Sequence, residues 1–340
     1  MIERKAMNFY TLLKDLCLCP SVSGREDNIR KKLCELITPL CDEVRTDNLG
    51  NLIALKKGSG NGKRIMLAAH IDEIGFMVTF VEDNGMIRVA PVGGVSLVAA
   101  AYSPVVSESG VKGALVPEEK LKPADFKADG FYIDVGAKSK KKAEALVSIG
   151  DFFVLEPNIK KIAGGRVCGR PLDDRVGCAV LLSIAEELAA ENIDDDVYYV
   201  FSVQEEVGCR GSQTAAFSVA PDVALCFDVT ATGDTLGASP MACKLGDGAA
   251  VKIKDSSVIC NEEITSMLCE LAEQKGIKYQ REILLFGGTD ASSMQLAGAG
   301  AKVGALSVPT RYIHTAVETC ELADALACVR LAVEFIKAEK

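Results

Sequence analysis

Five short clusters of polar residues contain the side chains most able to do chemistry. Each cluster lies at or just beyond the end of an apolar run, at residues 69–73, 172–175, 204–208, 227–228 and 311–314. In open α/β sheets, ligands bind outside the carboxyl ends of the strands, so these side chains can meet in one crevice. A ligand set of His, Asp and Glu without Cys suits zinc, cobalt or manganese, and one carboxylate can bridge two such ions about 3.5–4 Å apart.

The chain has only two histidines, His70 and His314. His70 ends the apolar run 64–70, and Asp72 follows two positions later. Residues two apart in an extended chain share a face, so the Asp72 carboxylate can accept the other imidazole N–H and hold the metal-binding tautomer. An ordinary buried histidine explains His70 equally well, and His314 on its own is compatible with an ordinary surface histidine.

An acidic pair, Glu205 and Glu206, directly follows the apolar run 197–203. Adjacent side chains of an extended backbone point to opposite sides, so one glutamate can bind a metal while the other takes a proton from the attacking water. Burial among other carboxylates would raise the pKa of such a base. A solvated acidic pair at a strand end is an equally weighted alternative.

Three aspartates extend this pattern. Asp228 closes the apolar run 224–227, where a carboxylate is costly unless it is paired or bound to metal, and a helix N-cap is the alternative. Asp173 and Asp174 directly precede a helical pattern over 175–192. One of the two is expected to cap that helix and the other is free to act, but the spacing does not say which.

The elements that position these clusters follow from hydrophobic periodicity. Strands are predicted at 64–70, 197–203, 223–230 and 302–309, in alternation with helical patterns. Between them, residues 71–164 consist of short alternating segments divided by turns, which is typical of a small barrel. The sequence therefore predicts an α/β domain of residues 1–70 and 165–340, with a β-rich domain inserted at 71–164.

Composition excludes several function classes. Among 340 residues, 38 Lys and Arg face 47 Asp and Glu, a net charge of -9, and such a surface repels nucleic acid and anionic membranes. The N-terminal 20 residues mix charges with apolar residues and do not resemble a signal peptide. The 13 cysteines include no C-x-x-C pair, which indicates reduced thiols and a cytoplasmic location.

Six sequence blocks, taken in order, resemble the signature of a known family. The blocks are AAHIDEIGF, GRPLDDRVG, VQEEVG, CFDVT, FGGTDAS and PTRYIHTAVE. They are similar to those of the two-metal glutamyl aminopeptidases and tetrahedral (TET) aminopeptidases, and the likeness covers essentially the whole chain. The resemblance implies a metal-dependent aminopeptidase that removes N-terminal residues from peptides.

The resemblance also implies individual roles. Glu205 matches the general base, and Asp72 matches the residue that orients a histidine ligand. Asp173 matches the carboxylate that bridges two divalent ions, which settles the choice between it and Asp174. Zinc or cobalt is the ion expected at the site, and manganese also suits these ligands. The implied ligands are His70 and Asp228 for one ion, Glu206 and His314 for the other, and Asp173 for both.

For the fold, the resemblance implies a phosphorylase/hydrolase-like, three-layer α/β catalytic domain with an inserted PDZ-like dimerisation domain. It further implies a homo-oligomer such as a tetrahedral dodecamer. A related metal-dependent deacylase or carboxypeptidase is the competing enzyme hypothesis, and a non-catalytic peptide-binding scaffold is the competing non-enzyme hypothesis. Neither the motifs nor the resemblance indicates whether acidic, neutral or basic N-terminal residues are preferred.

Overall fold

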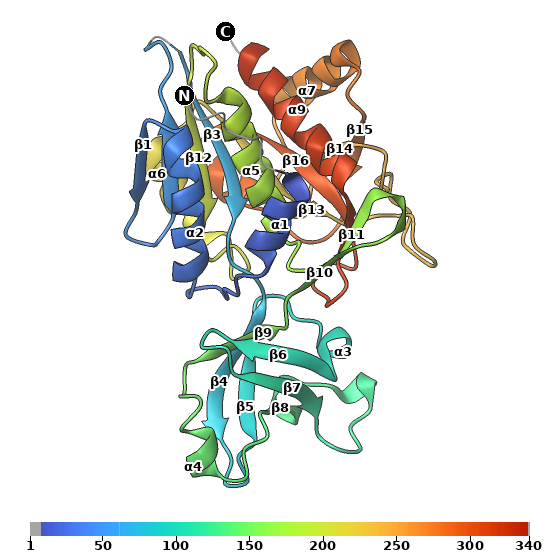
Figure 1. Ribbon diagram of the computed structural model, residues 1–340. Helices are drawn as coiled ribbons and strands as arrows, with labels where there is room; N and C mark the ends of the chain where they lie inside the picture. The colour runs from blue at the N-terminus through green and yellow to red at the C-terminus, as the bar shows by residue number, and fades with distance from the viewer. Residues whose placement is uncertain (1–7, 61, 339–340) are drawn as a thin grey trace.

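The computed structural model describes residues 8–60 and 62–338 of the chain. The first seven residues of the charged N-terminal segment lie outside this part. The described chain forms a mixed α/β fold with two lobes, a large sheet flanked by helices and a smaller barrel (Figure 1). Within the described residues, no helix has both the length and the apolar character needed to cross a bilayer.

The large lobe is built on an 11-stranded sheet. Its central strands β12, β3, β13 and β16 are parallel, so their carboxyl ends meet at one edge. Strands β14 and β15 extend it from β16. In spatial order the strands are β1 (Glu43–Thr46), β2 (Leu52–Lys56), β12 (Asp196–Ser202), β3 (Arg64–His70), β13 (Val223–Thr230), β16 (Lys302–Arg311), β17 (Thr319–Glu321), β11 (Arg166–Arg170) and β10 (Asn158–Lys161), with β14 (Ala249–Lys254) and β15 (Tyr279–Ile283) off this path.

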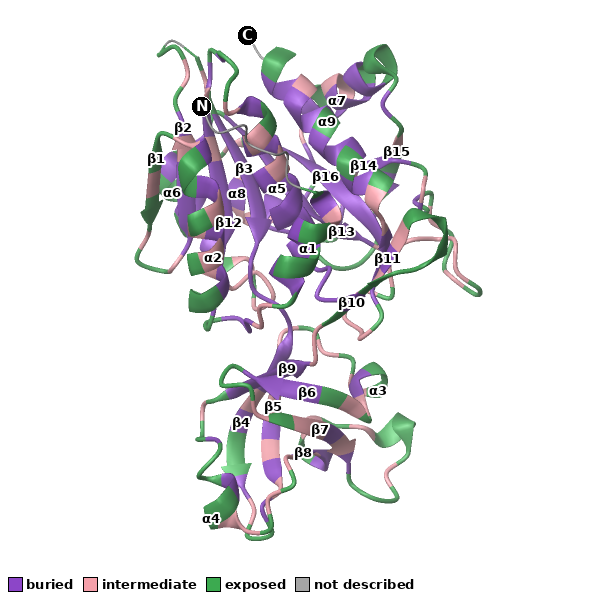
Figure 2. Cartoon of the chain, in the orientation of Figure 1, coloured by how far each residue is buried: buried purple, intermediate pink, exposed green. Residues whose placement is uncertain are grey.

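Helices cover both faces of this sheet, which explains why its central strands are continuously apolar. In β3, Ile65 and Leu67 belong to the hydrophobic core on one face, whereas Met66 and Ala68 belong to the core on the other. Figure 2 shows β3 and β16 buried along most of their length. The first face carries α1 (Phe9–Cys17), α2 (Asp27–Ile37), α5 (Arg175–Leu188), α7 (Glu262–Lys275) and α9 (Leu322–Ala338); the second carries α6 (Arg210–Val219) and α8 (Ala291–Gln295).

The smaller lobe is a closed antiparallel barrel that the chain enters after β3 and leaves before β10 (Figure 1). Its interior is a separate hydrophobic core that includes Phe76, Leu115 and Phe131. The lobe also carries two short helices, α3 (Leu97–Ala100) and α4 (Lys140–Ala143). The barrel strands, in order around it, are β4 (Gly75–Val81), β5 (Ile87–Val92), β8 (Phe131–Asp134), β7 (Lys112–Pro117), β6 (Ser103–Ser107) and β9 (Phe152–Leu155).

Candidate active site

The carboxyl ends of the parallel strands border a cavity of about 700 Å³. His70 is the last residue of β3 and pairs with Ser202 at the end of β12, so the residues that follow both strands lie beside each other. The cavity contains six of the seven predicted site residues: His70, Asp173, Glu205, Glu206, Asp228 and His314. The seventh, Asp72, is fully buried beside them.

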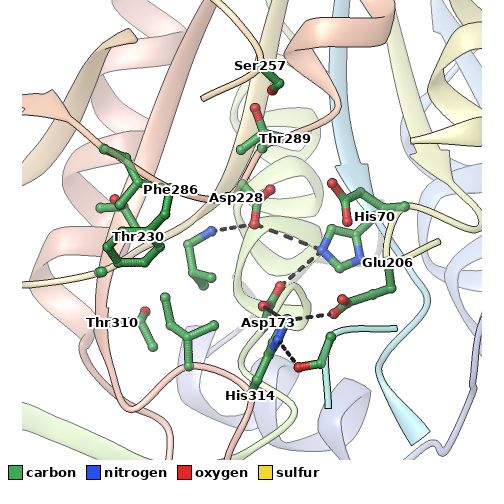
Figure 3. A pocket seen from close by; sticks show the side chains of 18 of the residues that line it. His70, Asp173, Glu206, Asp228, Thr230, Ser257, Phe286, Thr289, Thr310 and His314 are labelled. Carbon is green, nitrogen blue, oxygen red and sulfur yellow. Dashed lines mark hydrogen bonds and ion pairs between the residues drawn. The ribbon is translucent and has the colours of Figure 1, made fainter. Parts of the chain in front are cut away.

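Asp173 lies between the two histidines (Figure 3). Its Oδ1 is 3.0 Å from His70 Nε2, and its Oδ2 is 3.2 Å from His314 Nε2. A further carboxylate lies near the same nitrogen of each histidine. Glu206 Oε1 lies 3.2 Å from His314 Nε2, and Asp228 Oδ1 lies 3.9 Å from His70 Nε2. The residues thus form two adjoining sets of potential ligands that share Asp173.

Both histidine rings are held with the same nitrogen toward the cluster. His70 Nδ1 lies 3.0 Å from the Asp72 carbonyl oxygen, and His314 Nδ1 lies 2.9 Å from the Gly94 carbonyl oxygen. A carbonyl oxygen can only accept a hydrogen bond, so each Nδ1 carries the proton. Each Nε2 therefore faces the carboxylates, which is the nitrogen that would bind a cation placed between them, as in metal-binding histidines.

Asp174 has the structural role that one member of the aspartate pair was expected to have. Its Oδ1 accepts the Gly177 N–H at 3.0 Å as the N-cap of α5. Its Oδ2 is buried with no hydrogen-bond partner, and its ligand atoms lie within 4.8 Å of those of His70 and Asp228. Asp174 therefore borders the cluster, whereas Asp173 contacts both histidines directly.

Asp72 contacts other parts of the site in addition to His70, its predicted partner. Its carboxylate is 3.5 Å from His70 Nδ1, farther than its own carbonyl oxygen. The same carboxylate accepts the backbone N–H groups of Glu205 at 2.9 Å and Glu206 at 3.2 Å, and the Ser23 hydroxyl at 2.6 Å. It therefore fixes the loop that carries the glutamate pair as well as facing the histidine.

The glutamate pair does not lie on an extended strand, so that part of the sequence argument is wrong. β12 ends at Ser202, and Gln204 has a left-handed backbone with a φ of 56°, which turns the chain before the pair. The two side chains still have different neighbours. Glu205 accepts the Cys209 thiol at 3.2 Å, and Glu206 faces His314. Burial raises the pKa of Glu205, as expected, and the nearby Asp290 and Asp228 carboxylates add to the rise.

Glu318 was missed as a site residue. One of its carboxylate oxygens accepts the Leu172 and Asp173 N–H groups at 2.6 and 3.2 Å, and the other accepts the His314 N–H at 3.0 Å. Burial raises the pKa of Glu318 to about 7. Its position four residues after His314, inside the same sequence block, was the available signal. Glu318 joins the two backbone segments that present Asp173 and His314.

The donor atoms of the cluster fit divalent cations. They are carboxylate oxygens and imidazole nitrogens, a set suited to zinc, cobalt and manganese. Burial raises the pKa of Asp228 well above its usual range, and the Asp173 carboxylate contributes to the rise. Two divalent ions would supply four positive charges to a cavity that contains four carboxylates, Asp173, Glu205, Glu206 and Asp228.

Comparisons with known proteins give a consistent result. The family model for M42 glutamyl aminopeptidases matches residues 50–331. A putative aminopeptidase of Acetivibrio thermocellus is 45% identical over 332 residues, covering 97% of this chain and 98% of that protein. The structure of aminopeptidase APDkam598 from the archaeon Desulfurococcus kamchatkensis matches with a TM-score of 0.93 at 36% identity, covering 97% of this chain and 94% of that one. The TET1 peptidase of Pyrococcus horikoshii, which can assemble into a tetrahedron or a large octahedral shell, matches with a TM-score of 0.87 at 32% identity, covering 97% and 100%.

Proposed function

The chain belongs to the M42 glutamyl aminopeptidase family and is a metal-dependent aminopeptidase, and we propose that its reaction uses two divalent ions bound at the described cluster. The observation that carries this proposal is the position of Asp173, whose two carboxylate oxygens each lie within 3.2 Å of a different histidine. A carboxylate shared in this way is the bridging group that a two-metal site needs.

In this proposal Asp173 is common to both ions. His70 and Asp228 complete the set for one ion, and Glu206 and His314 complete the set for the other. Bound divalent ions supply Lewis-acid polarisation of the scissile carbonyl and lower the pKa of water. We propose zinc or cobalt as the native ions, with manganese also compatible with these ligands.

Glu205 is proposed as the general base. Its carboxylate lines the cavity and is not part of the Asp173-centred contacts, so it can face a water molecule and accept its proton. It then returns the proton to the leaving amine of the cleaved peptide. Asp72 holds the backbone N–H of Glu205 and so positions this base. The carboxylates around it also attract the positively charged N-terminus of a peptide, which favours removal of the first residue.

The assembly is proposed from the relatives and from the barrel. The TET1 peptidase is described as assembling into closed shells, and we propose that this chain forms a homo-oligomer, with a tetrahedral dodecamer as the form to test. The barrel would act as a PDZ-like dimerisation domain. Large apolar side chains on its surface support this role, namely Val98, Tyr102 and Ile149.

We also propose a cytoplasmic location. All 13 cysteines lie within the described residues, and all of them are free thiols. Unpaired cysteines in this number fit a reducing compartment.

The test is reconstitution of chelator-treated protein with zinc, cobalt or manganese. The substrates are a mixed set of short peptides with free or acetylated N-termini, followed by mass spectrometry, together with N-acyl amino acids. We expect two ions per chain and loss of the first residue from free peptides only. Cleavage of N-acyl amino acids, or of peptides from the carboxyl end, would instead favour the deacylase or carboxypeptidase hypothesis.

A further inference from the structure

The cavity extends beyond the proposed metal ligands to a second region of different character. In Figure 3, Phe286, Thr230 and Thr310 lie on the side of the cavity away from His70 and Glu206. We name this region the neutral wall and define it by Thr230, Ala231, Leu284, Phe286, Thr310 and Ile313. When the first peptide bond of a substrate lies at the ligand cluster, the neutral wall borders the part of the cavity that can hold the side chain of the first residue.

Arg311 is the only Lys or Arg among the described residues that line the cavity, and its charge is already paired. Asp234 accepts two hydrogen bonds from it, from Nε at 2.9 Å and from the guanidinium Nη2 at 2.6 Å. Burial alone would raise the pKa of Asp234. The hydrogen bonds from Arg311 and nearby groups outweigh this effect and hold the pKa below its usual range. The pair is therefore ionised throughout the working pH range, and Arg311 offers no net charge to a ligand.

The two hydroxyl groups of the neutral wall also donate to partners within the chain. Thr230 donates to Glu282 at 2.8 Å, and Thr310 donates to the Val308 carbonyl oxygen at 3.0 Å. Glu282 in turn forms a fully buried ion pair with Lys252 behind the wall. A carboxylate entering this region would lose water and meet no unpaired cation, and an ammonium group would lose water and meet no unpaired carboxylate, which makes either transfer unfavourable.

Given the proposed aminopeptidase function, we propose that the neutral wall selects an uncharged N-terminal side chain of medium size, such as Leu or Met. Asp234 is the specificity-determining residue, because it withholds Arg311 from acidic side chains. The same pair acts in the other direction, because Asp234 does not itself line the cavity and its charge is balanced by Arg311, so no unpaired carboxylate attracts basic side chains.

The first test is a panel of aminoacyl p-nitroanilides with Leu, Met, Glu or Lys as the aminoacyl group, assayed on the metal-loaded protein. We expect kcat/KM for the Leu and Met substrates to exceed that for the Glu and Lys substrates by at least about 100-fold. A preference for Glu or Lys would overturn this inference and leave the aminopeptidase function standing. Hydrolysis of none of the four would count against the proposed function itself.

The second test separates the two charges of the pair. Asp234→Asn releases Arg311, so the Glu/Leu ratio of kcat/KM should rise about tenfold or more. Arg311→Gln releases Asp234, so the Lys/Leu ratio should rise instead. The double variant Asp234→Asn/Arg311→Gln removes both charges and should keep the wild-type preference for Leu.

The matched control is Asp247→Asn, which removes a half-exposed aspartate that pairs with Lys244 outside the cavity. Its ratios should equal those of the wild type. Unchanged Glu/Leu and Lys/Leu ratios in correctly folded single variants would contradict the role of the Asp234–Arg311 pair. If Asp234→Asn fails to fold, Asp234→Ser makes the same test of the Glu/Leu ratio, and Arg311→Met replaces Arg311→Gln for the Lys/Leu ratio.

Discussion

The two ends of the cavity bury charge in different ways. At the catalytic end, Asp173 faces the Nε2 atoms of two histidines, and further carboxylates lie beside them. At the neutral wall, the chain supplies its own counter-ions, in the pairs Arg311–Asp234 and Lys252–Glu282. The carboxylates of the catalytic end therefore need cations from outside the chain to balance their charge, whereas the charges beside the neutral wall are balanced by partners within the folded chain.

The variant with the largest expected effect tests whether different residues of the catalytic end carry out proton transfer and ion binding. Glu205→Gln removes the proposed base but none of the proposed ligands. We expect kcat to fall about 10²–10⁴-fold while the metal content measured by mass spectrometry stays at the wild-type level. Loss of metal in this variant would show that Glu205 is a ligand, and would break the assignment of roles within the cluster.

The next effect tests whether the wall is stabilised by pairing within the chain. Glu282→Gln leaves the fully buried Lys252 ammonium without its closest partner. We expect the free energy of unfolding to fall by about 3–5 kcal/mol in a urea titration. The matched control is Glu263→Gln, which breaks an exposed pair with Lys302 and should leave the free energy of unfolding close to that of the wild type. Equal effects of the two variants would refute the distinction.

A smaller effect is expected for the residue that supports the catalytic end from outside the ligand set. Asp72→Asn replaces the carboxylate that faces His70 and holds the Glu205 and Glu206 N–H groups. Metal affinity, measured by competition with a chelator, should weaken about 10–100-fold. An affinity equal to that of the wild type would mean that the Asp72 carbonyl oxygen alone orients the histidine.

The smallest effect concerns Asp324, a carboxylate to which residues 8–60 and 62–338 supply backbone N–H donors and no salt bridge. Asp324 accepts the Gly246 and Gly248 N–H groups at 2.7 and 2.9 Å, yet burial raises its pKa to about 6. In the unfolded chain the pKa of Asp is about 4, so between pH 4 and 6 the folded state binds more protons. Stability therefore falls as the pH rises through this window.

Replacing Asp324 with Asn removes that titration. We expect thermal unfolding followed from pH 4 to pH 6 to show a shallower decline in the variant, with a difference on the order of 1 kcal/mol. A steeper decline than in the wild type would contradict the direction of the pKa shift.

Periodicity and strand-end chemistry were enough to predict much of the fold and of the cluster. β3 and β13 have the predicted bounds, because strands covered by helices on both faces are apolar along most of their length and so are visible as continuous apolar runs. Asp228 lies inside β13 rather than at a helix N-cap, so the cap alternative is wrong. Spacing alone did not decide between Asp173 and Asp174, since both precede the same helix; the resemblance favoured Asp173, and in the structure it is Asp173 that contacts both histidines while Asp174 caps the helix.

Other parts of the site had no local signal. The left-handed backbone at Gln204 is not favoured by its residue type, so the sequence indicated an extended chain through Glu205. The contact between Gly94 and His314 joins residues 220 positions apart and involves only a backbone oxygen on one side. The pairing of Arg311 with Asp234 likewise depends on a loop meeting a strand end, which no spacing rule anticipates.

The hydrogen bond from His314 to the Gly94 carbonyl has a practical consequence for anyone who wishes to shorten this protein. Gly94 lies in the segment between β5 and α3, within the excursion of the chain that makes the small lobe. Deleting that excursion to obtain a minimal enzyme would leave the ring of His314 free to rotate and to take the wrong tautomer. The small lobe therefore supplies a contact that holds one of the proposed metal ligands in place, so a shortened protein would have to replace that contact.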